Sequence, residues 1–429
     1  MAIRYIQNYD QLAKTEERKI VLQLIDAAIA AIQPGEVMET HFTLQDKTLQ
    51  IRDTEIDLNK FQRVFLVGFG KGSAGISGVI EKKLGDVLTE GYVIDTKPQE
   101  FTKIQFTLGS HPLPSAENLT FTNTMLEKIS NLKETDLVIF VTCGGGSAML
   151  ESPHTLRLDQ LINLNKALLH AGANIHDMNV IRKHVSKIKG GGLAEHLYPA
   201  TVVNLVFSDV PGDDLSVIAS GPLIKDPSTV DQAWDLFLHY KLNETITMEQ
   251  RDFQETPKDD KYFEKVTNIM MVSNMTALKE METKAKELGK NVTIYSNSFQ
   301  SDADVAGKTL IDATQPNSIL LAGGETTVLV KGKGGEGGRN QELVIASLPY
   351  LDEKTTIASF DSDGVDNSPI AGAIADHLTI QTAKEKQLDP QTYVQNHDSS
   401  PFLKSVGDAI LTDRLSSNVS DLMIVLKKN

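Results

Sequence analysis

The chain is poor in the residues that build disulfide scaffolds, and it contains no long apolar run. Cys143 is the single cysteine among 429 residues, which excludes an intrachain disulfide and a zinc site made of several cysteines. A lone cysteine is typical of proteins from a reducing compartment. No uninterrupted stretch of about 18 apolar residues is present, and the amino-terminal segment lacks the apolar core of a signal peptide. The sequence therefore predicts a cytoplasmic protein without a membrane partner.

Basic residues are also fewer than acidic residues. Lys and Arg together number 42 against 57 Asp and Glu, which gives a formal net charge of -15. Because an acidic surface repels a phosphate backbone, a nucleic-acid partner is excluded, whereas a small anion can still bind where Lys and Arg cluster locally. Hydrophobic residues make up 40% and charged residues 23%, as in globular proteins. The length predicts two or three domains.

Short β-branched runs that end in glycine alternate with helical segments along most of the chain. Strands are predicted at 64–67, 137–141, 202–207, 268–272, 291–295, 318–322, 326–330, 355–360 and 422–426, and helices at 10–33, 157–171, 174–189, 275–288, 301–313 and 340–350. Repetition of strand, glycine loop and helix is the signature of βαβ units and a parallel sheet. The polar stretch 241–265 indicates a surface connection near a domain boundary. The predicted fold class is α/β, with two α/β domains at 1–245 and 265–429 and a cleft between them.

Glycine is concentrated in four loops, at 68–72, 144–146, 190–192 and 332–338. A strand that ends in glycines before a helix offers bare backbone N–H groups to an anion, and the helix dipole adds to the attraction. The alternative is that these glycines only form tight turns. The pattern G-x-x-x-x-G-K-[ST] is absent, and the loop at 68–72 does not complete G-x-G-x-x-G, because position 73 is Ser. The loops therefore favour phosphate over a dinucleotide.

Charged residues accompany these loops. Lys71 and Arg339 lie within glycine loops, and phosphoryl transfer needs cations around the transferred group, although both could be solvated surface charges. Asp209 and Asp363 follow predicted strands, where carboxylates either hold Mg²⁺ together with its waters or form turns. The basic run 182–189 leads into a glycine loop and is either an anion site or a solvated face.

A series of short motifs extends over most of the chain, each weak alone but specific as an ordered set. The motifs are Gly70–Ser73, Gly109–Pro114, Cys143–Ala148, Val180–Ala194, Ser208–Asp213, Ile218–Pro222, Gly323–Val328, Gly337–Glu342, Asp363–Asp366 and Ala371–Ala373. In this order they resemble the glycerate 2-kinase family, whose carboxyl-terminal domain is of the MOFRL type. Some members of that family are named hydroxypyruvate reductase.

The resemblance implies a larger amino-terminal Rossmann-like α/β/α sandwich, a smaller carboxyl-terminal α/β domain and an active-site cleft between them. It implies ATP-dependent phosphorylation of D-glycerate to 2-phosphoglycerate with Mg²⁺ or another divalent cation, and it allows a homodimer. The site residues expected on this basis are Lys71 and Arg339 for catalysis, Gly70, Gly144, Gly145, Gly146, Ser147 and Lys189 for the nucleotide, Arg182, Glu325 and Asn340 for glycerate, and Asp209 and Asp363 for the metal.

The chain departs from the family pattern at Gly192, at Asn367–Pro369 and over 411–418. The last two departures bear on the exact substrate more than on the reaction, so a kinase of a related small hydroxy acid is one alternative. An NAD(P)H-dependent hydroxypyruvate reductase is another, and the missing dinucleotide fingerprint disfavours it. A non-catalytic sensor of sugar acids is the third, and the placement of Lys71 and Arg339 in glycine loops disfavours that.

Overall fold

The computed structural model describes residues 4–330 and 332–429, which form two compact units. Unit 1 takes its residues from Met1–Glu36, Asp209–Asp213 and Val272–Asn429, and unit 2 consists of Val37–Ser208 and Asp214–Met271. The division predicted from the sequence is linear, whereas the amino-terminal segment belongs with the carboxyl-terminal half of the chain. The polar stretch 241–265 lies inside unit 2, because its few apolar residues are buried there against helices.

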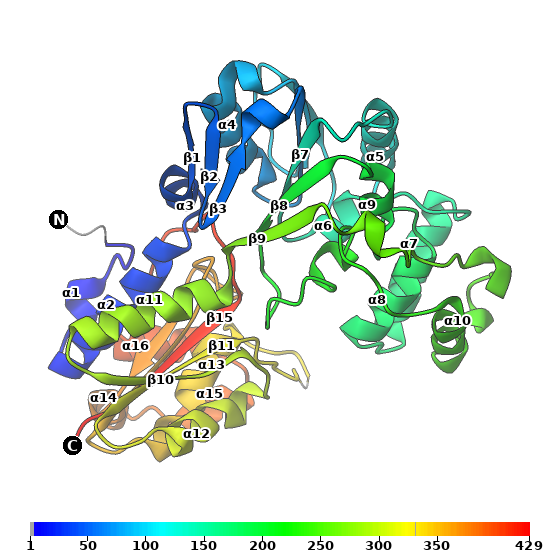
Figure 1. The fold of residues 1–429 in the computed structure, drawn as a ribbon. Helices are drawn as coiled ribbons and strands as arrows, with labels where there is room; N and C mark the ends of the chain where they lie inside the picture. The colour runs from blue at the N-terminus through cyan, green and yellow to red at the C-terminus, as the bar shows by residue number, and fades with distance from the viewer. Residues whose placement is uncertain (1–3, 331) are drawn as a thin grey trace. The chain divides into compact units, whose positions relative to one another are not determined.

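Unit 2 is built on a six-stranded sheet with the strand order β6-β5-β4-β7-β8-β9, of which Figure 1 labels β7, β8 and β9. Its strands are β4 (Arg63–Phe69), β5 (Glu90–Asp95), β6 (Ile104–Leu108), β7 (Asp136–Thr142), β8 (Thr201–Phe207) and β9 (Val266–Val272). The pairs from β6 to β8 are all parallel. Nearly every residue of β4, β7 and β8 is buried, which confirms the prediction from their continuous apolar runs.

Helices and a small antiparallel sheet complete unit 2. The helices are α3 (Pro34–His41), α4 (Ser73–Leu84), α5 (Ala116–Lys128), α6 (Gly146–Met149), α7 (Leu158–His170), α8 (Ile175–His184), α9 (Gly192–Leu197) and α10 (Val230–His239), and the small sheet is β1 (Phe42–Gln45), β2 (Thr48–Ile51) and β3 (Thr54–Asp57). The helix predicted at 174–189 ends at His184, because Ser186 instead forms a bridge with Pro153. The basic run therefore lies partly on a helix and partly in a turn.

The strand order of this sheet reverses at β4. The chain passes from β4 to β5 and β6 on one side, and it returns with β7 on the other side of β4. The loops that follow β4 and β7 therefore diverge at the carboxyl ends of two neighbouring parallel strands. In open α/β sheets, ligands bind in the crevice at such a reversal. The two loops at this position in unit 2 are the glycine loops at 70–72 and 144–146.

Unit 1 contains a mixed sheet with the strand order β10-β11-β15-β12-β13-β14. Its strands are β10 (Asn291–Phe299), β11 (Ser318–Gly324), β12 (Thr355–Asp361), β13 (Gly372–Ala375), β14 (Ala409–Ile410) and β15 (Asp421–Lys427), and its helices are α1 (Tyr9–Leu12), α2 (Glu16–Ala31), α11 (Asn274–Glu287), α12 (Ala303–Ala313), α13 (Arg339–Ala346), α14 (His377–Glu385), α15 (Pro390–Gln395) and α16 (Ser399–Val406). β15 pairs antiparallel with both β11 and β12. The strand predicted at 326–330 is wrong: Thr327 makes only an isolated bridge, and Leu329 and Val330 are 74% and 52% exposed.

A fully buried arginine fixes the amino-terminal helix in unit 1. The predicted helix 10–33 is divided into α1 and α2, and α2 packs against α11 (Figure 1). Arg18 on α2 donates from Nε and Nη2 to the two carboxylate oxygens of Asp376, each at 2.8 Å. Its Nη1 donates to Asp408 at 2.6 Å. Both carboxylates are buried as well, and Lys14 also pairs with Asp408 at 2.7 Å, so two cations compensate the two carboxylates.

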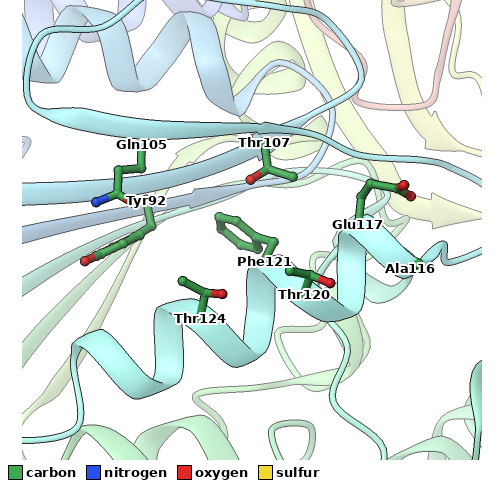
Figure 2. Close-up of a pocket in the computed structure, with 8 residues that line it drawn as sticks. All are labelled: Tyr92, Gln105, Thr107, Ala116, Glu117, Thr120, Phe121 and Thr124. Carbon is green, nitrogen blue, oxygen red and sulfur yellow. The ribbon is translucent and has the colours of Figure 1, made fainter.

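A small cavity of about 240 Å³ lies between α5 and the strands β5 and β6 (Figure 2). Tyr92, Phe121 and Thr124 are among its lining residues, and it contains none of the residues predicted for the functional site. Within 4–330 and 332–429, no single helix is long and apolar enough to cross a membrane, and only α2 and α3 taken together as a bent pair meet that criterion.

We expect Arg18→Leu to lower the free energy of unfolding by about 3–5 kcal/mol, because it leaves Asp376 buried without its cation and leaves Asp408 with Lys14 alone. Urea unfolding followed by far-UV circular dichroism measures this loss. Lys19→Leu on the same helix is the matched control, since the side chain of Lys19 is 44% exposed and pairs with the exposed Glu16. Equal, small losses in the two variants would contradict the anchoring role of Arg18.

Candidate functional site

The glycine loops after β4 and β7 are joined by backbone hydrogen bonds. The N–H of Lys71 donates to the carbonyl of Gly144 at 2.8 Å, and the N–H of Cys143 donates to the carbonyl of Phe69 at 3.0 Å. Gly70 has a φ of 100°, and a Cβ at this position would overlap the carbonyl oxygen of Cys143. Only glycine meets both requirements. The two loops therefore form one continuous surface at the strand reversal.

Asp95 occupies the anion position at the start of α4. Its Oδ2 accepts hydrogen bonds from the N–H groups of Gly72 at 2.9 Å and Ala74 at 3.0 Å, and its side chain is buried at the end of β5. The first glycine loop therefore satisfies these N–H groups with a carboxylate of the protein. In contrast, the N–H groups of Gly144 and Gly145 donate to no protein acceptor in the part of the chain that the structure describes. Of the two loops, the second is the one whose backbone can receive a phosphate.

Lys71 and His111 flank this second loop. Lys71 is exposed, and within residues 4–330 and 332–429 its ammonium forms no ion pair or hydrogen bond. The imidazole of His111 lies over Gly145, where a Cβ would be 2.8 Å from its Cδ2. Burial and the charge of Lys71 hold the pKa of His111 below its usual value. The imidazole is therefore neutral near pH 7, and Lys71 remains the cation available to an anion at this loop.

Lys189 and Arg182 lie behind the same loop. Lys189 is 1% exposed, and its Nζ donates to the carbonyls of Ser147 at 2.9 Å and Leu150 at 3.0 Å and pairs with Glu151 at 3.0 Å. Burial lowers its pKa, and Glu151 opposes that effect. Because these three contacts match its three hydrogens, Lys189 holds the loop from the buried side. Arg182 is half-buried, and only its Nε has a partner among the described residues, Asn165 at 2.7 Å.

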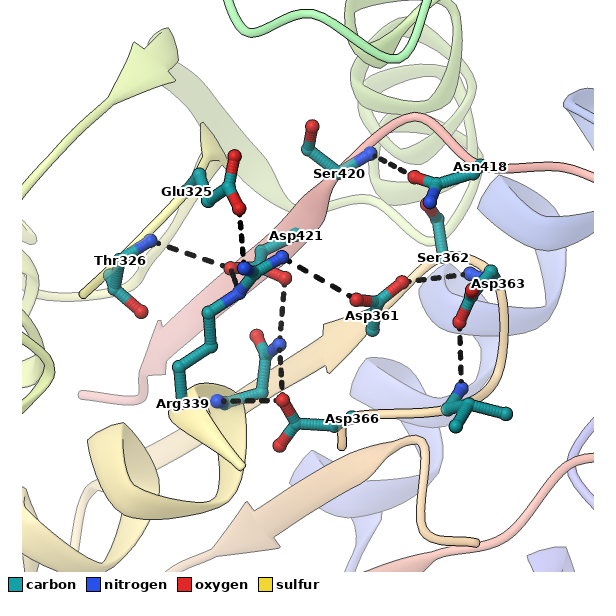
Figure 3. A network of polar contacts seen from close by, with 12 residues as sticks. Glu325, Thr326, Arg339, Asp361, Ser362, Asp363, Asp366, Asn418, Ser420 and Asp421 are labelled. Atoms are coloured by element: carbon teal, nitrogen blue, oxygen red, sulfur yellow. Dashed lines mark hydrogen bonds and ion pairs between the residues drawn. The ribbon is translucent and has the colours of Figure 1, made fainter. Parts of the chain in front are cut away.

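Arg339 is the centre of a second cluster, which lies in unit 1 (Figure 3). It starts α13 and lines a cavity of about 840 Å³. Its Nε donates to Asp421 at 2.7 Å, its Nη1 donates to Glu325, and its Nη2 lies 3.5 Å from Asp361. Glu325, Asp361 and Asp363 line the same cavity. Of the predicted residues, the structure thus brings Arg339, Glu325 and Asp363 together.

Carboxylates outnumber cations in this cluster, and burial makes their ionisation costly. Burial, reinforced by Asp421 and Asp363, raises the pKa of Asp361 to about 8. Burial also raises the pKa of Asp421 to about 6, although Arg339 opposes the effect. Arg339 is itself partly buried, yet the neighbouring carboxylates raise its pKa and keep it charged. A further positive charge beside these carboxylates would therefore be electrostatically favourable.

The other predicted residues of unit 1 support this cluster. Asn340 is fully buried; its amide donates to Asp421 at 2.7 Å and to Asp366 at 3.3 Å, and its oxygen accepts from Ser359. Asn340 therefore orients Asp421 and has no polar group left for a ligand. The Oδ1 of Asp363 accepts from a backbone N–H within its own turn. The hydroxyl of Ser420 donates to the backbone carbonyl of Asp209 at 2.8 Å, so Asp209 lies beside the residue that precedes β15.

The metal prediction rests on few ligands. Among residues 4–330 and 332–429, no group of three or more His, Cys, Asp and Glu side chains is arranged to hold a metal ion. Mg²⁺ is commonly held by one or two carboxylates, while water and phosphate oxygens complete its coordination. Asp363 lines the cavity, and the assignment of Asp209 and Asp363 to a metal stays a prediction.

Sequence reasoning missed several residues that build the two clusters. Asp95 and Asp421 were not expected there, although Asp95 ends β5 and Asp421 begins β15. Two further residues were missed. Ser220 contacts Ser147 directly, and Asn179 accepts a hydrogen bond from Ser220. Neither has a recognisable spacing to Ser147 in the sequence.

We expect Lys71→Met to raise the pKa of His111, because removing the ammonium removes one of the two causes that lower it. The measurement is an NMR titration of the imidazole resonances, assigned with a His111→Gln variant. Lys82→Met, which removes an exposed positive charge from the last turn of α4, is the control and should leave the His111 titration in place. An unchanged titration in Lys71→Met would show that the two side chains do not interact.

Comparisons with known proteins cover almost the whole chain. A model of a domain family of unknown function (DUF4147) matches residues 20–253, and the MOFRL family model matches 318–421. A glycerate 2-kinase from Pyrococcus horikoshii is 31% identical over 95% of this chain and 97% of its own length. A D-glycerate 2-kinase from Thermotoga maritima is 33% identical over 95% of this chain and 98% of its own length.

The crystal structure of a glycerate kinase from that organism has a TM-score of 0.82 and 33% identity, with 95% of this chain and 99% of that chain covered. A relative in Agrobacterium vitis, 29% identical over 95% of this chain and 94% of its own length, carries the name putative hydroxypyruvate reductase.

Proposed function

Because the chain belongs to the glycerate 2-kinase family, we propose that it transfers a phosphoryl group from ATP to D-glycerate and releases 2-phosphoglycerate. The observation that carries this proposal is the similarity to glycerate 2-kinases over almost the full length of both chains. The glycine loops at the strand reversal of unit 2 support it, because a phosphate-bearing ligand suits such a position.

The loop Gly144–Gly146 would receive the phosphates of ATP. Two of its N–H groups have no protein acceptor among the described residues, whereas the loop after β4 is closed by Asp95. Lys71 would stabilise the negative charge that develops on the transferred group, since no carboxylate among the described residues pairs with its ammonium. Gly70 allows the close approach of the two loops, and Lys189 holds the second loop in place.

Binding of glycerate requires a cation for its carboxylate. The outer nitrogens of Arg182 are suited to this task, because only its Nε is engaged by the described residues. In unit 1, Arg339 would act on the transferred group through the nitrogens that face the cavity, with Glu325 keeping it oriented. Asn340 would act through Asp421, as a positioning residue.

A divalent cation would be held by Asp363 and Asp209, with water and phosphate oxygens as its other ligands. When bound, it would neutralise charge on the phosphate oxygens. The raised pKa of the buried Asp361 shows how costly uncompensated carboxylates are in this cavity, and an added cation would relieve that cost.

We place the reaction in the cytoplasm. We also propose that the protein can form a homodimer, which analytical ultracentrifugation tests.

Incubation with D-glycerate and ATP-Mg²⁺ should release ADP and 2-phosphoglycerate, identified by enzyme-coupled absorbance and by ³¹P NMR. A parallel incubation with hydroxypyruvate and NADH or NADPH should leave the reduced cofactor unconsumed, because the chain lacks a dinucleotide fingerprint. Cofactor oxidation without ADP release would replace the kinase proposal by the reductase. ADP release only with another hydroxy acid would keep the reaction and change the substrate.

Arg339→Lys should lower kcat by roughly 10²-fold or more, because an ammonium cannot reproduce the planar guanidinium that contacts several carboxylates at once. Arg339→Ala should lower it at least as much. Steady-state kinetics measure both variants, and ATP binding by calorimetry should stay close to wild type. Arg157→Lys is the control, since Arg157 is exposed and pairs with an exposed Asp159. Near-normal turnover in Arg339→Lys would reduce Arg339 to a replaceable surface charge.

A further inference from the structure

A row of three polar side chains leads from the interior of unit 2 to the loop after β7. The hydroxyl of Ser220 is fully buried and donates to Oδ1 of Asn179 at 2.8 Å. The Oγ of Ser220 also lies 3.2 Å from the Oγ of Ser147, which is half-buried at the end of the glycine loop. Asn179 and Ser220 have no role in the function proposed above.

The direction of these hydrogen bonds is set by the number of hydrogens. A hydroxyl carries a single hydrogen and can accept through its lone pairs. Because the hydrogen of Ser220 is directed to Asn179, the contact between the two serines requires Ser147 to donate to Ser220. Ser147 is then left with lone pairs alone on its free side. Such an oxygen can accept from a donor, but it cannot donate to a phosphate oxygen.

The backbone around Ser220 is held in a conformation that it would not adopt freely. Ala219, Ser220 and Gly221 have φ values of 52°, 62° and 61° in succession, and left-handed backbone is unfavourable for residues other than glycine. The carbonyls of Ser220 and Gly221 accept from Gly190 at 3.0 Å and Gly191 at 2.9 Å. The glycine loop at 190–192 therefore fixes the position of Ser220, which is the role that the sequence left open for this loop.

The amide of Asn179 is buried beside Ser220. It is 3% exposed, and its Nδ2 is buried without a hydrogen-bond partner among the described residues. A buried amide that leaves its donor unsatisfied costs stability, so packing alone does not account for an asparagine at this position. Its oxygen is the group that the protein uses, and that group fixes the hydrogen of Ser220.

We propose that Asn179 and Ser220 are positioning residues that keep Ser147 as a hydrogen-bond acceptor for a hydroxyl group of the hydroxy-acid substrate. This inference rests on the kinase function proposed above. Near the phosphate-binding loop, the phosphate groups of ATP offer oxygens, whereas a hydroxy acid offers an O–H that needs an acceptor. Ser147 orients that hydroxyl through its lone pairs and takes no proton from it. Its backbone carbonyl is held independently by Lys189.

The test compares Ser147→Ala, Ser220→Ala and a control, Ser130→Ala, in which an exposed serine of the same unit loses a local hydrogen bond. For each protein, the KM values for D-glycerate and ATP and the half-saturating Mg²⁺ concentration are measured, and ATP binding is measured by calorimetry. We expect Ser147→Ala to raise the KM for D-glycerate about tenfold, the effect of one lost hydrogen bond. Ser220→Ala should also raise the KM for D-glycerate, and the affinity for ATP should be unchanged in both variants.

A pair of substitutions at Asn179 separates positioning from folding. Asn179→Asp keeps an oxygen acceptor for Ser220, whereas Asn179→Leu removes it at similar volume, so the increase in KM for D-glycerate should be smaller in the aspartate variant. Circular dichroism and thermal unfolding confirm that both are folded. Equal effects of the two substitutions on KM would overturn the positioning role.

Other outcomes overturn the assignment of Ser147. Weaker ATP binding with an unchanged KM for D-glycerate would make Ser147 a nucleotide ligand, and a raised Mg²⁺ requirement alone would make it a cation ligand. If the wild-type protein is active and Ser147→Ala has a normal KM for D-glycerate, this inference falls while the proposed function stands. If the wild type transfers no phosphate to D-glycerate, both fall.

Discussion

The site in unit 2 depends on the contact between two backbones at the point where β4 and β7 separate. These strands pair in parallel up to Phe69 and Thr142, so the chain leaves both at the same level of the sheet. The loops beyond can stay in contact only because Gly70 has no side chain to collide with Cys143. This single close approach places Lys71 beside the loop at 144–146. The remaining features of the cluster, including His111 and Lys189, are arranged around that second loop.

Two arginines of unit 1 show how the same chemistry serves different ends. Arg18 and Arg339 are each surrounded by carboxylates from distant parts of the chain. Arg18 is completely buried, so its ion pairs join a helix to the sheet and leave no group for a ligand. Arg339 lies beside a cavity, where burial, reinforced by the neighbouring carboxylates Asp421 and Asp363, raises the pKa of Asp361. Burial and access to the cavity, rather than residue type, separate a structural role from a functional one.

The sequence predicted what is encoded locally. The apolar runs of β4, β7 and β8 identified a buried parallel sheet, and glycine after two of these strands located the loops at the strand reversal. Features that depend on distant pairing were not predictable. Asp421 enters the cluster because β15 inserts between β11 and β12, and no local pattern specifies that insertion. Asp95 closes the first glycine loop from the end of a neighbouring strand. Lys189 and Asn340 were expected to contact the nucleotide and glycerate, and only the structure shows that both side chains are turned toward protein atoms.

The division of the chain into units has a consequence for the order in which it folds during synthesis. Unit 2 is encoded almost entirely between residues 37 and 271, so it can collapse while the ribosome is still making the second half of the protein. Unit 1 forms later, because Arg18 contacts Asp376, which follows it by 358 residues, and because β15, near the centre of its sheet, is translated after the strands on both sides of it. Until then α2 exposes a charge and an apolar face that are made for partners not yet translated. During synthesis the segment that contains α2 is therefore exposed to misassociation, and chaperones that bind this segment would protect it.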